Sequence, residues 1–172
     1  MELPSIFTAI DIETTGLSKW DRIIEIAIVK CKGRKVQKKY HSLVYTDKKI
    51  AKEAELVHGI SQEMIIGKPQ VWDVLEKIRT IAGDSTLVAH NASFDKRFVL
   101  RAAKGCKIDL SNNWVDTLQI AREFLPHMQS HKLEKVAKEL RLDACRYHRA
   151  LDDAMMTALI YMDFLEMADE EL

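Results

Sequence analysis

The chain has 172 residues, of which 47% are hydrophobic and 30% are charged, as in an ordinary soluble globular protein. This length predicts a single domain that buries roughly two thirds of the surface of its unfolded chain. Lysine plus arginine and aspartate plus glutamate both number 26, so the net charge is zero at pH 7. Neutrality argues against a nucleic-acid binder that relies on a broad basic surface.

Cysteine usage and the N-terminal residues indicate a protein of the cytoplasm. Cys31, Cys106 and Cys145 are scattered without CxxC spacing, which favours reduced thiols over disulfides or a structural zinc site. The first residues contain no basic region followed by an apolar stretch, so no signal peptide is predicted. No apolar run approaches the ~18 residues that cross a bilayer, so we expect no membrane contact.

Three strands are predicted at the start of the chain. Residues 6–12 and 22–31 are rich in apolar β-formers, and residues 35–44 form a third run. Gly33 lies between the last two runs and suits a hairpin turn. The third run is dense in lysine, which is typical of an edge strand that resists association with another sheet.

The rest of the chain is predicted to be mainly helical. Apolar spacing predicts helices over 69–83, 93–105, 114–126, 131–142 and 149–168. Pro69 and Gly83 suit the start and end of the first helix, and Ser93 and Gly105 suit the N-cap and the stop of the second. Between these two helices, residues 86–90 read as a short buried strand.

This order of elements favours an α/β domain. Three successive strands, followed by strands mixed with helices, predict a mixed sheet with helices on its faces. We expect one domain over residues 1–172, in which residues 165–172 form a frayed acidic tail.

Acidic residues stand at unusual places in this pattern. Asp11 and Glu13 are two positions apart in a buried strand, so they project from the same face and repel each other. Asp95 falls in the first turn of the helix that follows the predicted strand at 86–90, and Asp153 lies near the start of the last predicted helix. For a lone acid such as Asp95, favourable interaction with the helix dipole is a sufficient explanation.

Taken together, the carboxylates indicate a metal site. Several carboxylates without cysteine select hard divalent cations, Mg²⁺ or Mn²⁺, which bind through oxygen. A bound cation removes the repulsion between Asp11 and Glu13 and supplies the positive charge that a neutral protein lacks. Two such ions, about 3.5–4 Å apart, stabilise both the attacking and the leaving oxygen of a phosphodiester.

Three ordered motifs carry a resemblance that covers nearly the whole chain. They are DIETTGL at 11–17, HNASFD at 90–95 and HRALDDA at 148–154. Weaker matches are EAELVHGIS at 53–61, VDTLQIAR at 115–122 and HKLEKVAKEL at 131–140. In this set the chain resembles the DEDDh 3′→5′ exonucleases, the superfamily of the proofreading (epsilon) subunit of bacterial DNA polymerase III.

The resemblance implies an RNase H-like fold, with a mixed five-stranded sheet whose three leading strands are antiparallel. It also implies a role for each motif residue. Asp11 would bridge two metals, while Glu13 and Asp153 would complete the site that holds the attacking water. Asp95 would support the second metal, and His148 would be the general base. An imidazole suits that role because histidine exchanges protons near neutral pH.

The position of the histidine distinguishes two types of relative. Enzymes of the tyrosine type place that residue four positions before the last aspartate, where this chain has Arg149. Tyr147 is six positions before it and does not fit, whereas His148 is five before it. The chain is therefore similar to the histidine type.

The same resemblance implies a site for the 3′ end of the substrate. Its residues would be Glu13, Thr14, Leu17, Glu53, His58, Asn91 and Phe94. Glu13 and the backbone near Thr14 would hold the terminal hydroxyl, and Leu17 would wedge against the last bases.

Four of these residues have an alternative interpretation. Leu17 and Phe94 could be core residues, Glu53 could be a solvated helix acid, and His58 could cap a turn beside Gly59.

The other histidines and tryptophans carry no comparable argument. We predict that His90 is structural and that His41, His127 and His131 lie on the surface. Trp72 is expected to pack in the core, and Trp20 to lie near the rim of the cleft without a part in the site.

The leading functional hypothesis is a metal-dependent exonuclease that removes nucleotides from 3′ ends of single-stranded DNA and releases 5′-monophosphates in proofreading or repair. The closest alternative is an RNA-trimming enzyme of the RNase T or oligoribonuclease type. Thr14 favours the DNA-specific branch, because enzymes of the oligoribonuclease type usually carry methionine at this position. A catalytically silent adaptor is the alternative of another class, although all four acids and the histidine are present.

A DNA polymerase is a candidate partner. The absence of a long tail after the last helix fits either a free-standing enzyme or a domain of a larger protein, and neutrality predicts distributive action.

Overall fold

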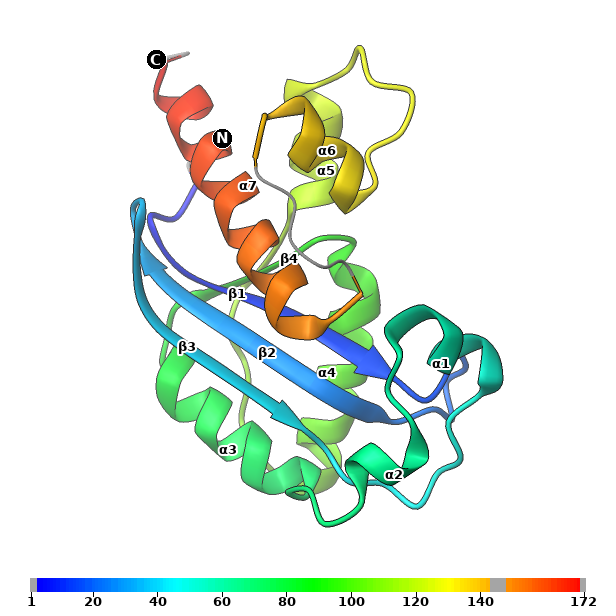
Figure 1. Ribbon diagram of the computed structural model, residues 1–172. Coiled ribbons are helices and arrows are strands. Elements are labelled where there is room, and N and C mark those ends of the chain that lie inside the picture. The colour runs from blue at the N-terminus through cyan, green and yellow to red at the C-terminus, as the bar shows by residue number, and fades with distance from the viewer. Residues whose placement is uncertain (1–2, 143–147, 171–172) are drawn as a thin grey trace.

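The computed structural model describes residues 3–142 and 148–170. Over these residues it forms one sheet of five strands in the order β3-β2-β1-β4-β5, with helices on both faces (Figure 1). The strands are β1 Ile6–Thr14, β2 Ile23–Lys32, β3 Lys35–Leu43, β4 Thr86–Ala89 and β5 Trp114–Asp116. The helices are α1 Lys52–His58, α2 Gln62–Ile65, α3 Val71–Ala82, α4 Ala92–Cys106, α5 Thr117–Phe124, α6 Leu133–Glu139 and α7 Ala150–Glu170.

The sheet is mixed, as the sequence predicts. β1, β2 and β3 pair antiparallel, while β4 and β5 extend the sheet parallel to β1. The β2–β3 connection turns at Gly33, whose φ of 53° is available to glycine at no steric cost. The lysine-rich strand β3 lies at the edge of the sheet, which confirms that prediction.

The alternation of β1 decides what each face of the sheet contacts. Phe7 and Ala9 belong to the core cluster beneath α7, whereas Ile10 and Ile12 belong to the cluster beneath α3 and α4. Because successive side chains alternate, Asp11 and Glu13 continue the face that α7 covers. A register shift between Glu13 and Thr14 then ends the regular pairing with β2.

Two short helices absent from the predicted elements, α1 and α2, lie beyond the end of β1. They pack over a small core cluster that contains Ile24, Ile50, Ile60 and Ile65. The backbone N–H of Ala51 donates to the carbonyl of Thr15, which ties this region to the chain directly after β1. Figure 1 shows α1 and α2 at the end of the sheet where β1 finishes.

The structure corrects the predicted helix at 114–126. Residues 114–116 form β5, because Trp114 pairs with Leu87 of the neighbouring parallel strand β4. The helix begins only at Thr117, where the carboxylate of Asp116 accepts the N–H of Leu118 as an N-cap.

The predicted limits of α4 are also wrong by one or two residues. Asn91, with a φ of 63°, precedes the helix in place of Ser93, and its side chain makes no capping hydrogen bond. The helix passes through Gly105 and ends at Cys106, followed by Lys107 in the left-handed conformation. Asparagine and other polar residues adopt this conformation at moderate cost, so glycine is not required.

The last helix extends beyond its predicted end at residue 168. Helix α7 continues to Glu170, since Leu165 and Met167 pack against the core beneath it. Cys145 and Tyr147, for which the sequence predicts a reduced thiol and no catalytic part, lie outside the described residues. In the described part of the chain no helix is long and apolar enough to cross a membrane.

Candidate active site

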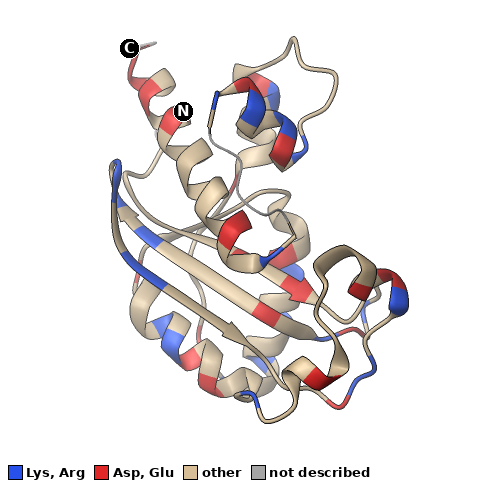
Figure 2. Ribbon diagram, viewed as in Figure 1, with Lys and Arg blue, Asp and Glu red and all other residues tan. Residues whose placement is uncertain are grey.

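Three carboxylates meet where β1 passes beneath the start of α7. Asp11, Glu13 and Asp153 each offer an oxygen, and these oxygens all lie within 4.8 Å of one another. Figure 2 shows acidic positions of β1, β2 and the start of α7 gathered in this region. The sheet and the helix thus bring together residues more than 130 positions apart in sequence.

Asp95 joins this group from the first turn of α4. It is buried, with 4% of its surface exposed. Burial raises its pKa to about 8, hydrogen bonds from the backbone of Asp95 and Ile12 oppose that rise, and the charges of Asp116 and Asp153 add to it. The structure therefore places all four predicted acids in one region, with Asp95 beside the three whose oxygens converge.

The acids are held at close range without enough positive charge to balance them. Burial, followed by the charges of Asp95, Asp153 and Glu13, raises the pKa of Asp11 well above its ordinary value. Burial and the charge of Asp153 raise the pKa of Glu13 to about 8. Burial raises the pKa of Asp153 to about 6, although the nearby His148 lowers it. At neutral pH Glu13 and Asp95 therefore retain protons unless a cation replaces them, whereas Asp153 is largely ionised.

The residues present fit a divalent cation. Oδ1 of Asp153 is buried and has no hydrogen-bond partner among the described residues. An unpartnered buried carboxylate oxygen is costly, and a cation would satisfy it. The converging donors are all carboxylate oxygens, which is the ligand set that Mg²⁺ and Mn²⁺ prefer.

His148 stands on the loop before α7, as the sequence predicts. Its backbone N–H donates to Oδ2 of Asp153 at 3.0 Å, and its side chain is exposed. With a φ of 66°, it occupies the left-handed region that most side chains avoid. His148, Asp11, Asp153 and Asn91 all line one cavity of about 820 Å³, so the histidine shares a solvent space with the acids.

Other residues that line this cavity come from α5, from α6 and from the segment between these helices. Arg122 and Lys132 add positive charge there, and His131 lies between the helices. His131, predicted to lie on the surface, is partly exposed, and its Nε2 donates to the carbonyl of Leu125. His90 is structural, as predicted, since its ring nitrogens engage the Thr117 hydroxyl and the His131 carbonyl.

The predicted substrate residues differ in exposure. Leu17 is 79% exposed and is not a core residue, and Glu53 is exposed on α1. Thr14 is buried, with its hydroxyl donating to the carbonyl of Gly16. Phe94 is half-buried, with its ring centroid 4.9 Å from that of Phe98.

His58 is buried and uses both ring nitrogens within the fold. Nδ1 accepts the N–H of Ile60, so Nε2 carries the proton and donates to the carbonyl of Thr14 at 3.2 Å. Burial lowers the pKa of His58, which keeps the ring neutral. Through this bond His58 positions the backbone at the end of β1, beside the acids.

Glu25 is the site residue that sequence reasoning missed. It lies opposite Glu13 on β2, and its side chain is only 1% exposed. Arg149 donates to both of its oxygens, the N–H of Ala150 donates at 3.0 Å, and His41 lies 2.6 Å away. Burial alone would raise the pKa of Glu25, but these hydrogen bonds lower it, so the group is a carboxylate.

The Glu25 carboxylate anchors the start of α7, the helix that carries Asp153. A single acid within the apolar run RIIEIAIVKC is the sequence signal that could have found it. His41, predicted to lie on the surface, is partly exposed and also contacts this carboxylate. Trp72, predicted to be core, is 51% exposed on α3 because its helix buries Val74, Leu75 and Ile78 instead.

Metal-free protein is expected to lose stability as the pH rises from about 5 to 8. The pKa values of Glu13, Asp95 and Asp153 are about 8, 8 and 6 in the folded protein, above their ordinary values of 4.5, 3.8 and 3.8. The folded state therefore binds more protons than the unfolded state in this range, and stability present at low pH is lost as these groups ionise. Thermal unfolding in EDTA should show a fall on the order of 2 kcal/mol, or roughly 4–8 °C in Tm.

Addition of Mg²⁺ or Mn²⁺ should restore the lost stability, with a larger rise in Tm at pH 8 than at pH 5, because a cation binds the ionised cluster. A Tm in EDTA that is independent of pH between 5 and 8 would contradict this account of the cluster.

The chain is similar in sequence to known exonucleases and to parts of replicative polymerases. The exonuclease family model matches residues 8–161. DNA polymerase III PolC-type from Thermotoga maritima is 39% identical over 163 residues, which are 94% of this chain and 12% of that protein. The corresponding protein of Bacillus subtilis is 34% identical over 168 residues, 96% of this chain and 12% of that protein. The chain thus spans about an eighth of the length of these curated relatives.

Solved structures share the fold. Exonuclease X in complex with 5′ overhanging duplex DNA is 30% identical, with a TM-score of 0.79 over 95% of this chain and 93% of that chain. E. coli Exonuclease I in complex with a dT13 oligonucleotide has a TM-score of 0.82 at 18% identity, over 97% of this chain and 43% of that chain. These matches agree with the site itself, in which carboxylates converge on an RNase H-like sheet. The chain therefore belongs to the exonuclease family, and its motifs and fold are similar to those of the DEDDh-type 3′→5′ members.

Proposed function

We propose that the chain removes nucleotides one at a time from the 3′ end of single-stranded DNA and releases nucleoside 5′-monophosphates. The observation that carries this proposal is the convergence of Asp11, Glu13 and Asp153 within 4.8 Å at a cavity that His148 also lines. Asp95 adds a fourth carboxyl from α4.

In this proposal Asp11, Glu13, Asp95 and Asp153 hold two divalent cations, Mg²⁺ or Mn²⁺. When bound, the cations would polarise the phosphodiester and stabilise charge on the attacking oxygen of water and on the leaving oxygen of the substrate. His148 takes the proton of the attacking water, and its exposed side chain on a loop lets it reach the cavity.

The end of β1 receives the terminal nucleotide. Glu13 and the backbone at Thr14 hold the 3′-hydroxyl, and the hydrogen bond from His58 to the Thr14 carbonyl fixes that backbone. Leu17 is free to contact the last bases because 79% of its surface is exposed. Asn91 lines the cavity beside the acids.

Phe94 and Glu53 complete the proposed substrate contacts at the rim. Phe94 is half-buried one residue before Asp95, and Glu53 is exposed on α1, the helix that ends at His58.

The relatives support DNA as the substrate and proofreading or repair as the context. The curated relatives from Thermotoga maritima and Bacillus subtilis are PolC-type DNA polymerase III, and the 30%-identical structure is bound to DNA. We therefore propose action in the cytoplasm at DNA 3′ ends, with a DNA polymerase as partner.

The deciding experiment compares single-stranded DNA and RNA of the same sequence, each labelled at the 5′ end, with Mg²⁺ and with Mn²⁺. We expect DNA to be shortened from its 3′ end at least ~10-fold faster than RNA. Faster removal from RNA would replace the proposal with an exoribonuclease. If neither polymer is shortened although Mn²⁺ binds, the chain would be a silent member of its family.

A further inference from the structure

The loop that follows β1, residues 15–22, presents apolar side chains to water. Trp20 is 66% exposed and Leu17 is 79% exposed. An exposed indole on a surface loop often marks a contact with another molecule, since its large apolar face gains from being covered. The proposed function uses Leu17 at the terminal nucleotide, but it assigns no role to Trp20.

This loop is held in place by side chains from within and from α4. The Asp21 carboxylate accepts the Thr15 hydroxyl and the Ser18 N–H, each at 2.8 Å. Gly16 packs so closely on Asp21 that a Cβ there would lie 2.7 Å from its Oδ2. Trp20 is therefore exposed on a loop whose conformation is fixed by hydrogen bonds and close packing.

Two arginines one helical turn apart on α4 support the same loop. Arg97 donates to the carbonyl of Leu17, and Arg101 donates to the carbonyls of Lys19 and Asp21. Carbonyl oxygens carry no net charge, so these hydrogen bonds do not neutralise the guanidinium groups, although the Asp21 carboxylate of the same loop acts on Arg101.

Positive charge gathers around Trp20. The Nζ of Lys19 lies 5.0 Å from the centroid of the Trp20 ring. Partial burial, followed by the charges of Arg22 and Arg97, lowers the pKa of Arg101, which places three arginines within electrostatic range of one another. A neutral chain has therefore concentrated basic side chains next to its exposed indole.

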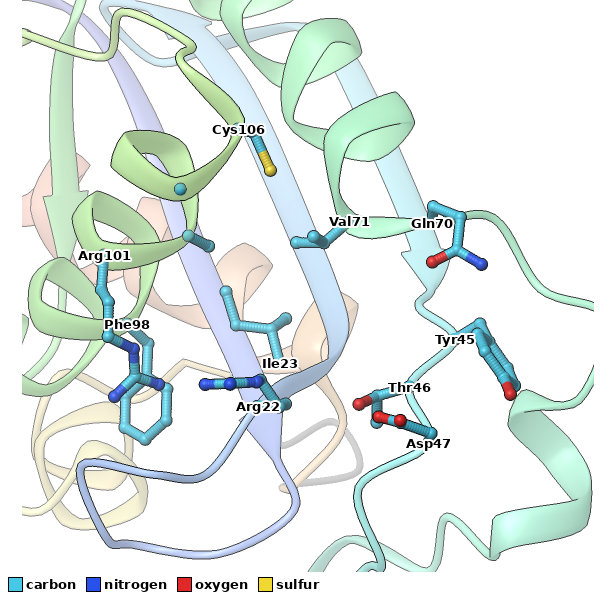
Figure 3. A pocket seen from close by; sticks show the side chains of 12 residues that line it. Arg22, Ile23, Tyr45, Thr46, Asp47, Gln70, Val71, Phe98, Arg101 and Cys106 are labelled. Carbon is cyan, nitrogen blue, oxygen red and sulfur yellow. The ribbon is translucent and has the colours of Figure 1, made fainter.

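A cavity of about 680 Å³ lies beside this cluster. Figure 3 shows Arg22 reaching toward Phe98 and Arg101 on one side, with Thr46 and Asp47 on the other. The guanidinium of Arg101 stacks 4.8 Å from the centroid of Phe98. The cavity thus offers a preorganised basic wall that an anionic group can approach.

The cluster continues outward from the acid site along α4. Asp95 lies in the first turn, and Arg97 and Arg101 follow it, so Arg101 is about 9 Å farther along the helix axis. Arg97 also lies 5.7 Å from the ring of Phe94, at the rim of the proposed substrate site. Arg97 therefore connects the basic cluster with the residues that are proposed to hold the 3′ end of the strand.

We propose that Trp20, Lys19, Arg22, Arg97 and Arg101 form a second binding site for the substrate strand, in which a base upstream of the terminal nucleotide stacks on Trp20 and phosphates contact the basic side chains. This inference rests on the proposed function. Its physical basis is that aromatic faces stack on bases regardless of sequence while basic side chains follow the backbone.

The test compares Trp20→Ala with Trp72→Ala, which removes a half-exposed tryptophan from α3 and should leave the kinetics unchanged. The substrates are a 12-nucleotide oligothymidylate and the p-nitrophenyl ester of thymidine 5′-monophosphate, which has no upstream base. We expect Trp20→Ala to raise the KM for the longer substrate roughly 5- to 100-fold relative to that for the nitrophenyl ester. Trp20→Phe should recover much of the loss, because phenylalanine also stacks.

An equal change in KM for both substrates, or the same change in Trp72→Ala, would overturn the second site. Unchanged KM for the longer substrate in Trp20→Ala would overturn it as well. If the parent protein hydrolyses neither substrate, the proposed function fails instead, so the two failures are distinguishable.

Arg22→Gln gives an independent measure of the charge contribution. It removes one cation, while the hydrogen bond from the Arg22 backbone N–H to Thr15 remains available. The slope of log KM against log salt concentration for the longer substrate should decrease by about the amount expected for one phosphate contact. An unaltered slope would remove Arg22 from the site.

Discussion

Asp11→Asn is expected to reduce the rate of 3′-end hydrolysis at least ~10³-fold, which corresponds to about 4 kcal/mol in the barrier. In the proposed mechanism Asp11 would be a ligand of the divalent cations, and it lies on β1 among the other acids. Asparagine keeps the shape of the side chain but removes one anionic ligand oxygen. The rate is measured by release of mononucleotides from labelled single-stranded DNA.

The same substitution is expected to stabilise the metal-free protein at pH 8. Burial and four neighbouring acids raise the pKa of Asp11, so its ionisation opposes folding and its removal relieves that cost. A higher Tm in EDTA together with lost activity would separate a ligand role from a folding defect.

Asp84→Asn provides the control for Asp11→Asn, since Asp84 is exposed in the turn between α3 and β4. It should change neither rate nor Tm. Hydrolysis by Asp11→Asn at the parental rate would refute the metal assignment.

His148→Gly is expected to lower kcat by about 10²- to 10⁴-fold, the usual contribution of a general base. Glycine is the informative replacement because the backbone at position 148 has a φ of 66°, which glycine adopts without strain. The backbone N–H that donates to Asp153 is retained, so Mn²⁺ binding should stay near that of the parent. Calorimetric titration with Mn²⁺ measures this directly.

Imidazole added to the His148→Gly protein should restore part of the rate, because a free base can enter the exposed position of the lost side chain. His127→Gly is the control, since His127 is exposed and pairs with Glu139 away from the acids. Loss of Mn²⁺ binding, or no response to imidazole, would indicate that His148 acts in another way.

Local pattern was sufficient for much of the fold. Alternation along β1 places Asp11 and Glu13 on one face, and the lysines of residues 35–44 mark the edge strand. Both features depend on neighbouring residues and on a fixed period of two, so they can be read from the chain itself. Local pattern failed at residues 114–116, where pairing with β4 overrides helical spacing.

Tertiary structure was needed wherever a property depends on distant residues. The raised pKa values of the acids follow from burial and from charges on β1, α4 and α7 at once. Glu25 became visible as an anchor only after α7 was placed over β2, because its partners Arg149 and Ala150 lie more than 120 positions away. Likewise, residues 15–22 contain nothing that reveals which side chains of α4 support the loop.

The sequence alone determined which parts this protein contains: an α/β domain, four acids and a histidine in motif order, and a set of carboxylate oxygens that suits divalent cations. These follow from residue type, short-range periodicity and resemblance. The folded chain alone decided the arrangement: three carboxylates within 4.8 Å, Glu25 clamped beneath α7, and Trp20 exposed beside a group of arginines. The division has a physical cause, because side-chain direction is set by local backbone geometry, whereas distance, burial and electrostatic coupling are set by long-range packing.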